Sequence, residues 1–252
     1  MGKDLLKRLL RRVGMDVMRY RAGTGHEVLP IDLSEEDRKI IQSVRPFTMV
    51  SLDGLIALIS AVRYIVRCGI SGDIVECGVW RGGSMMAAAL TLLAEKDMSR
   101  HLYLYDTFEG MPEPTSVDKS FDGTLAKLQL DRAQKGAGIW CYCGLDEVKV
   151  NLSSTGYPPA QIHFIKGKVE ETIPGNVPGL LGLLRLDTDW YESTKHELQY
   201  LFPLINKNGI MLIDDYGYWK GAKLAVDEYF ANQERQYYLH RIDYTGRLLV
   251  KY

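Results

Sequence analysis

Two predicted strands in the second half of the chain end in aspartates. The first ends at Asp187 and is followed two residues later by Asp189, and the second ends at Asp214 and Asp215. A single predicted helix, residues 193–205, connects the two strands. This pattern indicates a βαβ unit, in which both strand ends meet at one edge of a parallel sheet. We therefore expect these carboxylates to lie close together.

Three neighbouring carboxylates repel one another, and burial raises the free-energy cost of keeping them charged. A divalent cation bound by Asp187, Asp214 and Asp215 offsets both effects. Ligands that are all oxygen favour Mg²⁺, with Mn²⁺ or Ca²⁺ as alternatives. Aspartates also end strands as simple turn formers. Two acidic clusters on adjacent strand ends favour the metal site.

A glycine-rich turn forms the second candidate site. The strand Asp73 to Glu76 runs into Gly-x-x-x-Gly-Gly and then into a helix of small residues, 84–95. This order places a nucleotide-like ligand against free backbone N–H groups at a helix N-terminus. Asp106 ends the next strand, at the distance where such folds hold a ribose. The alternative is a tight turn without a ligand. Gly-x-Gly-x-x-Gly is absent, which argues against a nicotinamide cofactor.

The segments around these sites alternate between strand and helix patterns. Predicted strands are 73–76, 101–106, 161–167, 180–187 and 209–214, and predicted helices are 34–45, 51–68, 84–95, 144–154, 193–205 and 220–232. Such alternation predicts an α/β fold with a parallel sheet and helices on both faces. Segments 237–243 and 248–252 flank a turn and predict a closing antiparallel hairpin. Methyltransferase sheets end in this way, whereas nicotinamide-binding sheets usually end parallel.

Composition narrows the classes of function. The 252 residues carry a formal net charge of −1, so nothing indicates a nucleic-acid partner. No apolar run reaches the ~20 residues of a transmembrane segment. The four cysteines have no metal-site spacing, and we expect them to be reduced in a cytoplasmic protein.

The chain is expected to form one catalytic domain, residues 46–252, behind an N-terminal helical extension, residues 1–45. Residues 1–21 are basic and partly amphipathic, which fits packing on a partner subunit or contact with an acidic membrane surface. The polar stretch at about 113–143 lies beside the predicted site, as lid insertions often do.

Four motifs, taken in order, resemble the macrocin O-methyltransferase family between about Pro46 and Tyr229. They are Glu76–Ser84 (ECGVWRGGS), Tyr105–Pro112 (YDTFEGMP), Leu186–Thr194 (LDTDWYEST) and Ile213–Trp219 (IDDYGYW). The resemblance implies a Rossmann-like class I methyltransferase sheet. It also implies an enzyme that uses S-adenosyl-L-methionine and Mg²⁺ to methylate sugar hydroxyls, and a homodimer.

The resemblance assigns roles by position. The cofactor-binding residues it implies are Thr48, Met49, Glu76, Cys77, Gly78, Val79, Trp80, Ser84, Asp106, Thr107, Phe108, Glu109, Gly110, Gly167, Lys168, Val169 and Asp187. Lys168 and Val169 depart from the aromatic pair that the family more often carries after the glycine. Asp187, Asp214 and Asp215 match its metal ligands, and Asp189 matches its general base.

These roles agree with the chemistry of methyl transfer to an alcohol. A sugar hydroxyl holds its proton tightly, so it needs a cation that lowers its pKa and an acceptor within hydrogen-bond reach. Asp189 is better placed for that than His196, the other candidate base. The acceptor is expected to be a glycosylated natural product or a glycan. Two other readings stay open, namely a catechol or other phenol as acceptor, and a non-catalytic module that binds S-adenosylmethionine.

Overall fold

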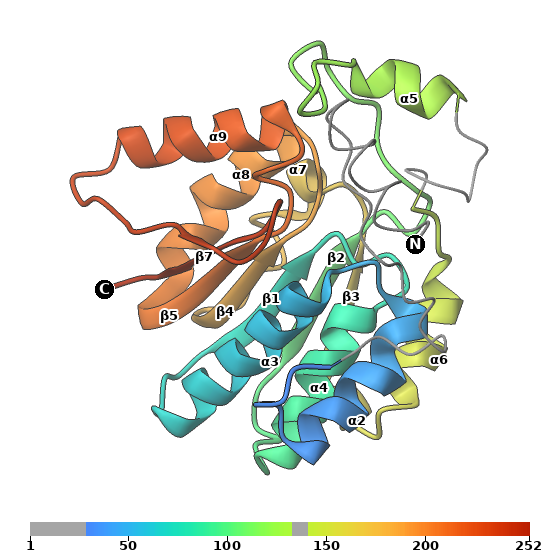
Figure 1. The fold of residues 1–252 in the computed structure, drawn as a ribbon, viewed down its shortest axis with the longest axis vertical. Coiled ribbons are helices and arrows are strands. Elements are labelled where there is room, and N and C mark those ends of the chain that lie inside the picture. Colours follow the sequence, from blue (N-terminus) through green and yellow to red (C-terminus); the bar gives the residue numbers. More distant parts are fainter. Residues whose placement is uncertain (1–28, 133–140) are drawn as a thin grey trace, which may run out of the picture. The chain divides into compact units, whose positions relative to one another are not determined.

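A mixed sheet of seven strands forms the centre of the protein (Figure 1). The structure is a computed structural model, and it describes residues 29–132 and 141–252. The predicted amphipathic segment 1–21 and residues 133–140 of the predicted lid lie outside the described residues. Residues 34–252 form one compact unit.

The strand order is β3-β2-β1-β4-β5-β7-β6. The strands are β1 (Asp73–Cys77), β2 (Leu102–Asp106), β3 (Ile162–Lys166), β4 (Leu181–Leu186), β5 (Ile205–Ile213), β6 (His240–Arg241) and β7 (Arg247–Val250). The first five pair in parallel, and β7 pairs antiparallel with β5 and β6. This arrangement confirms the predicted fold class, including the closing hairpin.

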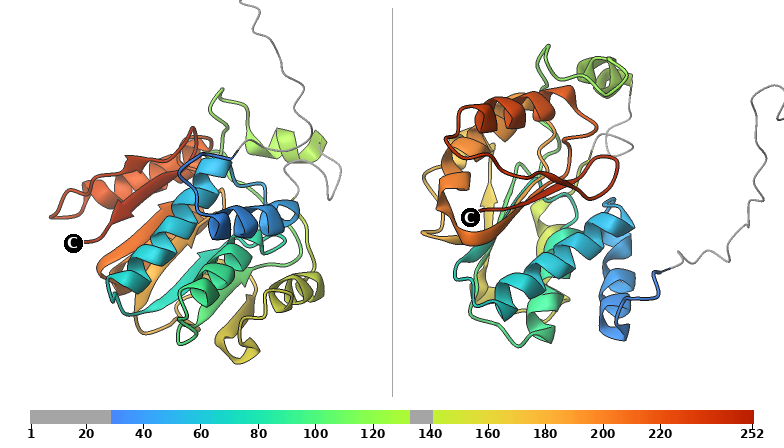
Figure 2. Two further views of the ribbon diagram at one scale, coloured as in Figure 1. Left: turned by 60° about the horizontal axis from the view of Figure 1, so that its bottom comes forward. Right: turned by 60° about the vertical axis from the view of Figure 1, so that its left-hand side comes forward.

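Helices cover both faces of the sheet (Figure 2). They are α2 (Glu35–Val44), α3 (Leu52–Arg67), α4 (Gly83–Ala94), α5 (Ala126–Arg132), α6 (Leu145–Ser153), α7 (Val169–Thr172), α8 (Tyr191–Leu201) and α9 (Lys220–Ala231). Helices α2, α3 and α4 pack together on one side, and α7, α8 and α9 pack together on the other. Among the described residues, no helix has the length and apolar character needed to cross a bilayer.

The structure differs from the predicted elements in a few places. Helix α8 ends at Leu201 rather than at 205, because Pro203 cannot continue it and a short 3-10 turn follows. Strand β5 begins at Ile205 rather than at 209. The insertion contains helix α5, which was not predicted. Helix α2 belongs to the compact unit and packs against α3 and α4.

The tips of β1 and β4 approach each other closely. Gly78 has a left-handed backbone, with φ +84°, and a Cβ there would lie 1.9 Å from the carbonyl oxygen of Asp187. Glycine is therefore required at this position. The Asp187 N–H donates to the Cys77 carbonyl at 2.8 Å, and the Asp214 N–H donates to the Leu186 carbonyl at 2.9 Å. These bonds align the ends of β1, β4 and β5 at one edge.

Candidate functional site

Strand register places four charged side chains on one face of the sheet. Glu76 is the partner of Arg185 in the β1–β4 pair, so both point to the same side. Asp187 follows Arg185 by two residues and shares its face. Asp214 follows Leu212, the β5 partner of Arg185, by two residues and joins the same face. An alternating pattern thus gathers three carboxylates around one guanidinium.

Arg185 is 4% exposed and contacts all three carboxylates. Its Nη1 donates to Glu76 Oε1 at 2.7 Å and to Asp187 Oδ2 at 2.6 Å, and its Nη2 donates to Asp214 Oδ1 at 2.8 Å. The second oxygen of Glu76 is buried and has no hydrogen-bond partner. Burial raises the pKa of Glu76 to about 7, although the guanidinium opposes that shift. Arg185 was not singled out in the sequence. A charged residue inside a buried strand was the signal that could have revealed it, because such a group needs partners.

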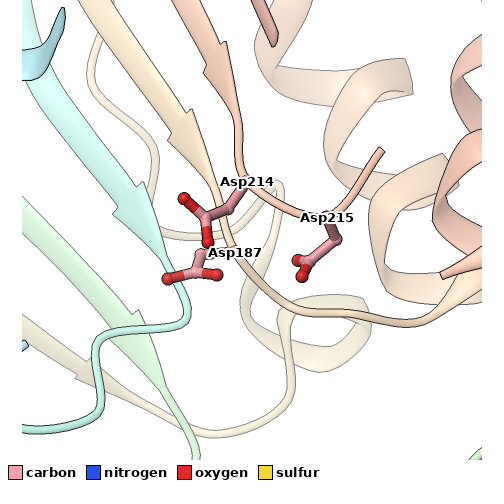
Figure 3. Close-up of side chains that lie close together, drawn as sticks. All are labelled: Asp187, Asp214 and Asp215. Atoms are coloured by element: carbon pink, nitrogen blue, oxygen red, sulfur yellow. The ribbon is translucent and has the colours of Figure 1, made fainter. Parts of the chain in front are cut away.

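The predicted metal ligands do converge (Figure 3). One carboxylate oxygen from each of Asp187, Asp214 and Asp215 lies within 4.8 Å of the others. Burial is the main cause that raises the pKa of Asp187 and of Asp215, and repulsion between the neighbouring carboxylates adds to it. One guanidinium does not balance this much negative charge, so the donor set fits a hard divalent cation.

Asp189 lies beside this cluster. Its backbone is left-handed, with φ +68°, and its N–H donates to Asp215 Oδ2 at 3.1 Å. The indole N–H of Trp219 donates to Asp189 Oδ1 at 2.6 Å, which fixes the carboxylate. Burial, followed by the charge of Asp187, raises the pKa of Asp189 to about 7. The Asp189 carboxylate is thus held in one orientation beside the predicted metal ligands.

A cavity of about 570 Å³ joins the acidic cluster to the glycine-rich turn. Most of the predicted site residues line it, from all four motifs. They are Thr48, Met49, Gly78, Val79, Trp80, Ser84, Asp106, Thr107, Gly110, Gly167, Lys168, Val169, Asp187, Asp189, Asp214 and Asp215. A cavity of this size accommodates a nucleoside together with a second small group.

Asp106 organises the glycine-rich end of the cavity. Its Oδ2 accepts the backbone N–H groups of Val79, at 2.7 Å, and of Trp80, at 3.1 Å. Its Oδ1 accepts the N–H of Phe108 at 2.7 Å. Burial raises the pKa of Asp106, and these three hydrogen bonds oppose the shift. The carboxylate thus ties the turn after β1 to the turn after β2.

Four predicted cofactor-binding residues do not line the cavity. Glu76 and Cys77 are buried beneath its floor, and Phe108 is 3% exposed. Glu109 points to solvent, where it pairs with Lys166 at 2.6 Å. The alternative base His196 lies elsewhere, because its Nε2 contacts the carbonyl oxygen of Ile173 at 3.0 Å.

The cavity also contains residues that the sequence analysis did not assign. They are Phe47, Val50, Gly83, Met111, Pro112, Cys141, Glu170, Thr188, Ser193 and Thr245, together with the aromatic residues Tyr105, Tyr218 and Trp219. Burial raises the pKa of the Cys141 thiol to about 12, and the charge of Asp189 adds to the shift. Tyr218 and Trp219 belong to the motif Ile213–Trp219, in which only the two aspartates were assigned a role.

Comparison with known proteins identifies a family and related enzymes. Residues 16–251 match the family model described as macrocin O-methyltransferase. One relative, from Streptomyces olivaceus, is the 8-demethyl-8-(2,3-dimethoxy-α-L-rhamnosyl)-tetracenomycin-C 4'-O-methyltransferase. It is 34% identical over 199 residues, which cover 79% of this chain and 73% of the relative. A second, the mycinamicin III 3''-O-methyltransferase of Micromonospora griseorubida, is 30% identical over 90% of this chain and 86% of its own length.

Solved structures extend this likeness to the fold. The O-methyltransferase NovP superposes with a TM-score of 0.71 at 29% identity, covering 81% of this chain and 82% of that protein. An O-methyltransferase from Bacillus cereus in complex with SAH shares the fold alone, with a TM-score of 0.52 at 11% identity over 88% of this chain and 94% of that protein. The family match and the relatives together establish that this chain belongs to the macrocin O-methyltransferase family and is an O-methyltransferase.

Proposed function

We propose that the protein transfers a methyl group from S-adenosyl-L-methionine to a sugar hydroxyl of a glycosylated natural product or glycan, with the help of Mg²⁺. The observation that carries this proposal is the single cavity shared by two sites. The glycine-rich turn with Asp106 lies at one end, and Asp187, Asp189, Asp214 and Asp215 lie at the other. The name of the first relative described above specifies O-methylation of a rhamnosyl-bearing compound, and the name of the second specifies O-methylation of mycinamicin III.

The glycine-rich end suits the methyl donor. We assign the ribose hydroxyls to Asp106, a partly buried carboxylate that lines the cavity and joins two turns. The buried free oxygen of Glu76 and the N-terminus of α4 lie on the methionine side. Gly167, Lys168 and Val169 follow β3 and border the adenine side. We propose that the other predicted cofactor-binding residues, including Thr48 and Met49, contact the same ligand.

The acidic end suits the acceptor. Asp187, Asp214 and Asp215 would hold Mg²⁺, which would supply Lewis-acid activation of the acceptor hydroxyl. Asp189 would accept the proton of that hydroxyl, and Trp219 keeps the Asp189 carboxylate in place. Arg185 neutralises part of the charge and orients Asp187 and Asp214 from below. The enzyme acts mainly by positioning the two reactants.

Turnover assays test this proposal. Purified enzyme with S-adenosylmethionine is mixed with glycosides, with their aglycones, and with a catechol, and products are detected by mass spectrometry. We expect a gain of one methyl group on the glycosides alone, lost after EDTA treatment and restored by Mg²⁺. Methylation of the catechol or the aglycone would support a phenol-directed enzyme. Binding of S-adenosylhomocysteine without turnover on any acceptor would support a non-catalytic module.

We also propose a homodimer, in which residues 46–252 form the methyltransferase domain with α2 packed on it. The amphipathic pattern of residues 1–21 supports this, and so does an apolar groove between α3 and the closing hairpin, lined by Ile56, Leu248 and Val250 among others. Light scattering coupled to size-exclusion chromatography tests it, because a monomer has a mass of 28.6 kDa. A single species of that mass at micromolar concentration would contradict the dimer.

A further inference from the structure

Three aromatic rings meet beside the cavity, and one of them, that of Tyr218, lines it. The ring of Phe121 packs edge-on against Tyr218, with centroids 5.5 Å apart, and against Tyr244, with centroids 5.9 Å apart. Phe121 is 52% exposed and Tyr244 is 62% exposed. Large aromatic side chains left adjacent and open to solvent mark binding surfaces more often than isolated exposed ones do. We name Phe121, Tyr218 and Tyr244 the aromatic rim.

The aromatic rim is continuous with the reacting end of the cavity. Tyr218 lines the cavity, and its ring packs against Trp219, with centroids 4.9 Å apart. Trp219 in turn donates to Asp189. Aromatic contacts therefore run from the proposed general base to the surface. A ligand on the rim is in reach of a sugar that sits at Asp189.

Backbone hydrogen bonds fix the segments that carry the three rings. The Lys220 N–H donates to the Lys119 carbonyl at 2.7 Å, which ties the insertion to the start of α9. The Gly217 N–H donates to the Thr245 carbonyl at 2.9 Å, which ties the loop after β5 to the turn between β6 and β7. A Cβ at Gly217 would lie 2.0 Å from the Tyr244 carbonyl oxygen, so this contact requires glycine.

The insertion is anchored a second time. Asp118 is fully buried, and its Oδ1 accepts the Tyr191 N–H at 2.8 Å, while its Oδ2 accepts the Thr115 N–H at 2.7 Å. These bonds hold the segment before Phe121 on the N-terminus of α8. The exposed rings thus stand on a preformed support, which lowers the entropy cost of binding.

We propose that the aromatic rim binds the aglycone of the substrate, and that this aglycone is an aromatic or polycyclic planar group. The inference rests on the proposed function, because it places the methylated sugar at Asp189. Ring faces and edges favour flat apolar partners, and the neighbouring cavity walls, Met111 and Pro112, add no charge. The rim therefore selects among glycosides by what the sugar is attached to.

Calorimetry on the protein loaded with S-adenosylhomocysteine and Mg²⁺ tests this inference without turnover. The probes are the 2-naphthyl and methyl glycosides of L-rhamnose and of D-glucose. We expect the wild type to bind a naphthyl glycoside about tenfold more tightly than the matching methyl glycoside. In Phe121→Ala and Tyr244→Ala the ratio of the two affinities falls towards one.

Tyr238→Ala is the matched control, because Tyr238 is an aromatic residue that is 80% exposed and does not line the cavity. It should keep the wild-type ratio, and all variants should bind S-adenosylhomocysteine as the wild type does. A wild-type ratio within about twofold, a ratio that survives both substitutions, or no binding of any probe would overturn the inference.

Parallel assays with S-adenosylmethionine separate this inference from the proposed function. Rim-dependent binding of naphthyl glycosides that are never methylated would contradict the function and leave the aromatic rim intact. Methylation of both kinds of glycoside with equal efficiency would uphold the function and overturn the aromatic rim.

Discussion

At the scale of single residues, Asp189 combines a left-handed backbone with a carboxylate held by Trp219. Asparagine adopts this backbone region readily and has the same shape, so Asp189→Asn removes the base with little effect on the fold. We expect turnover to fall by about 10²- to 10⁴-fold. The affinity for S-adenosylhomocysteine, measured by calorimetry, should stay within a few-fold of the wild type.

Asp122→Asn is a suitable control for this change, because Asp122 is exposed and accepts hydrogen bonds only within the insertion. It should turn over normally. An Asp189→Asn enzyme that remains active, or one that loses the cofactor product, would rule out the role of base.

Arg185 gives a prediction about stability. Replacing it with glutamine leaves Glu76, Asp187 and Asp214 without their buried counter-charge. Breaking a buried ion pair in this way costs about 3–5 kcal/mol. Urea unfolding of Arg185→Gln in the absence of metal should show a loss of that order, whereas Arg235→Gln at an exposed position should behave as the wild type. Equal stability of both variants would contradict the central position of Arg185.

The sequence predicted the convergence of Asp187, Asp214 and Asp215 because parallel strand ends meet at one edge whatever the packing details. It did not reveal Arg185, because its role depends on register. Only the pairing of Glu76 with Arg185 shows that the guanidinium lies under the carboxylates. Likewise, the contact between Trp219 and Asp189 joins residues thirty positions apart, and no local pattern specifies it.

At the scale of elements, His163 on β3 contacts His101, the residue directly before β2. His101 Nδ1 and His163 Nε2 lie 2.7 Å apart, and their rings stack. Burial lowers the pKa of His163 below its usual 6.5, the positive charge of His101 adds to the shift, and Asp73 opposes it. His163 is half-buried on β3.

The sign of the pH effect follows from this lowered pKa. Below about pH 6.5 the unfolded chain binds a proton at residue 163 more readily than the folded protein does. The contribution to stability is therefore present above that pH and is lost as the pH falls through the lowered pKa. We expect the melting temperature to fall less between about pH 7.5 and 5.5 in His163→Gln than in the wild type.

Exposed His240 supplies the control for this comparison. His240→Gln should keep the wild-type pH dependence. Parallel melting curves for wild type and His163→Gln across this pH range would refute the effect.

The predicted strands and helices agree with the structure where the sequence pattern is strong and differ from it at some of their ends. Apolar runs and turn residues placed every strand of the parallel sheet, because burial on both faces leaves a strong signal. The end of α8 and the start of β5 differ from the predicted positions. Pro203 ends the helix, and residues 205–208 belong to β5 although they lie outside its pairing with β7. Helix α5 was missed because its apolar side chains are few and contact only the small cluster around Trp190 and Trp219.

At the scale of the whole molecule, the proposed function depends on two sites that open into one cavity. The fold brings them together because β1, β4 and β5 are adjacent in the sheet and end at the same level. Motif order indicated this arrangement, and the family match over residues 16–251 agrees with it. The aromatic rim was beyond sequence patterns, because its three rings come from separate loops whose meeting depends on the packed structure.

Diffraction at the manganese absorption edge tests the central claim most directly. Crystals of the wild-type enzyme would be grown with Mn²⁺, as a substitute for Mg²⁺, and with S-adenosylhomocysteine. The account predicts an anomalous peak bound directly by oxygens of Asp187, Asp214 and Asp215, with the sulfur of the cofactor product facing it in the same cavity. An anomalous peak elsewhere, or three carboxylates without one beside a fully bound cofactor product, would contradict it.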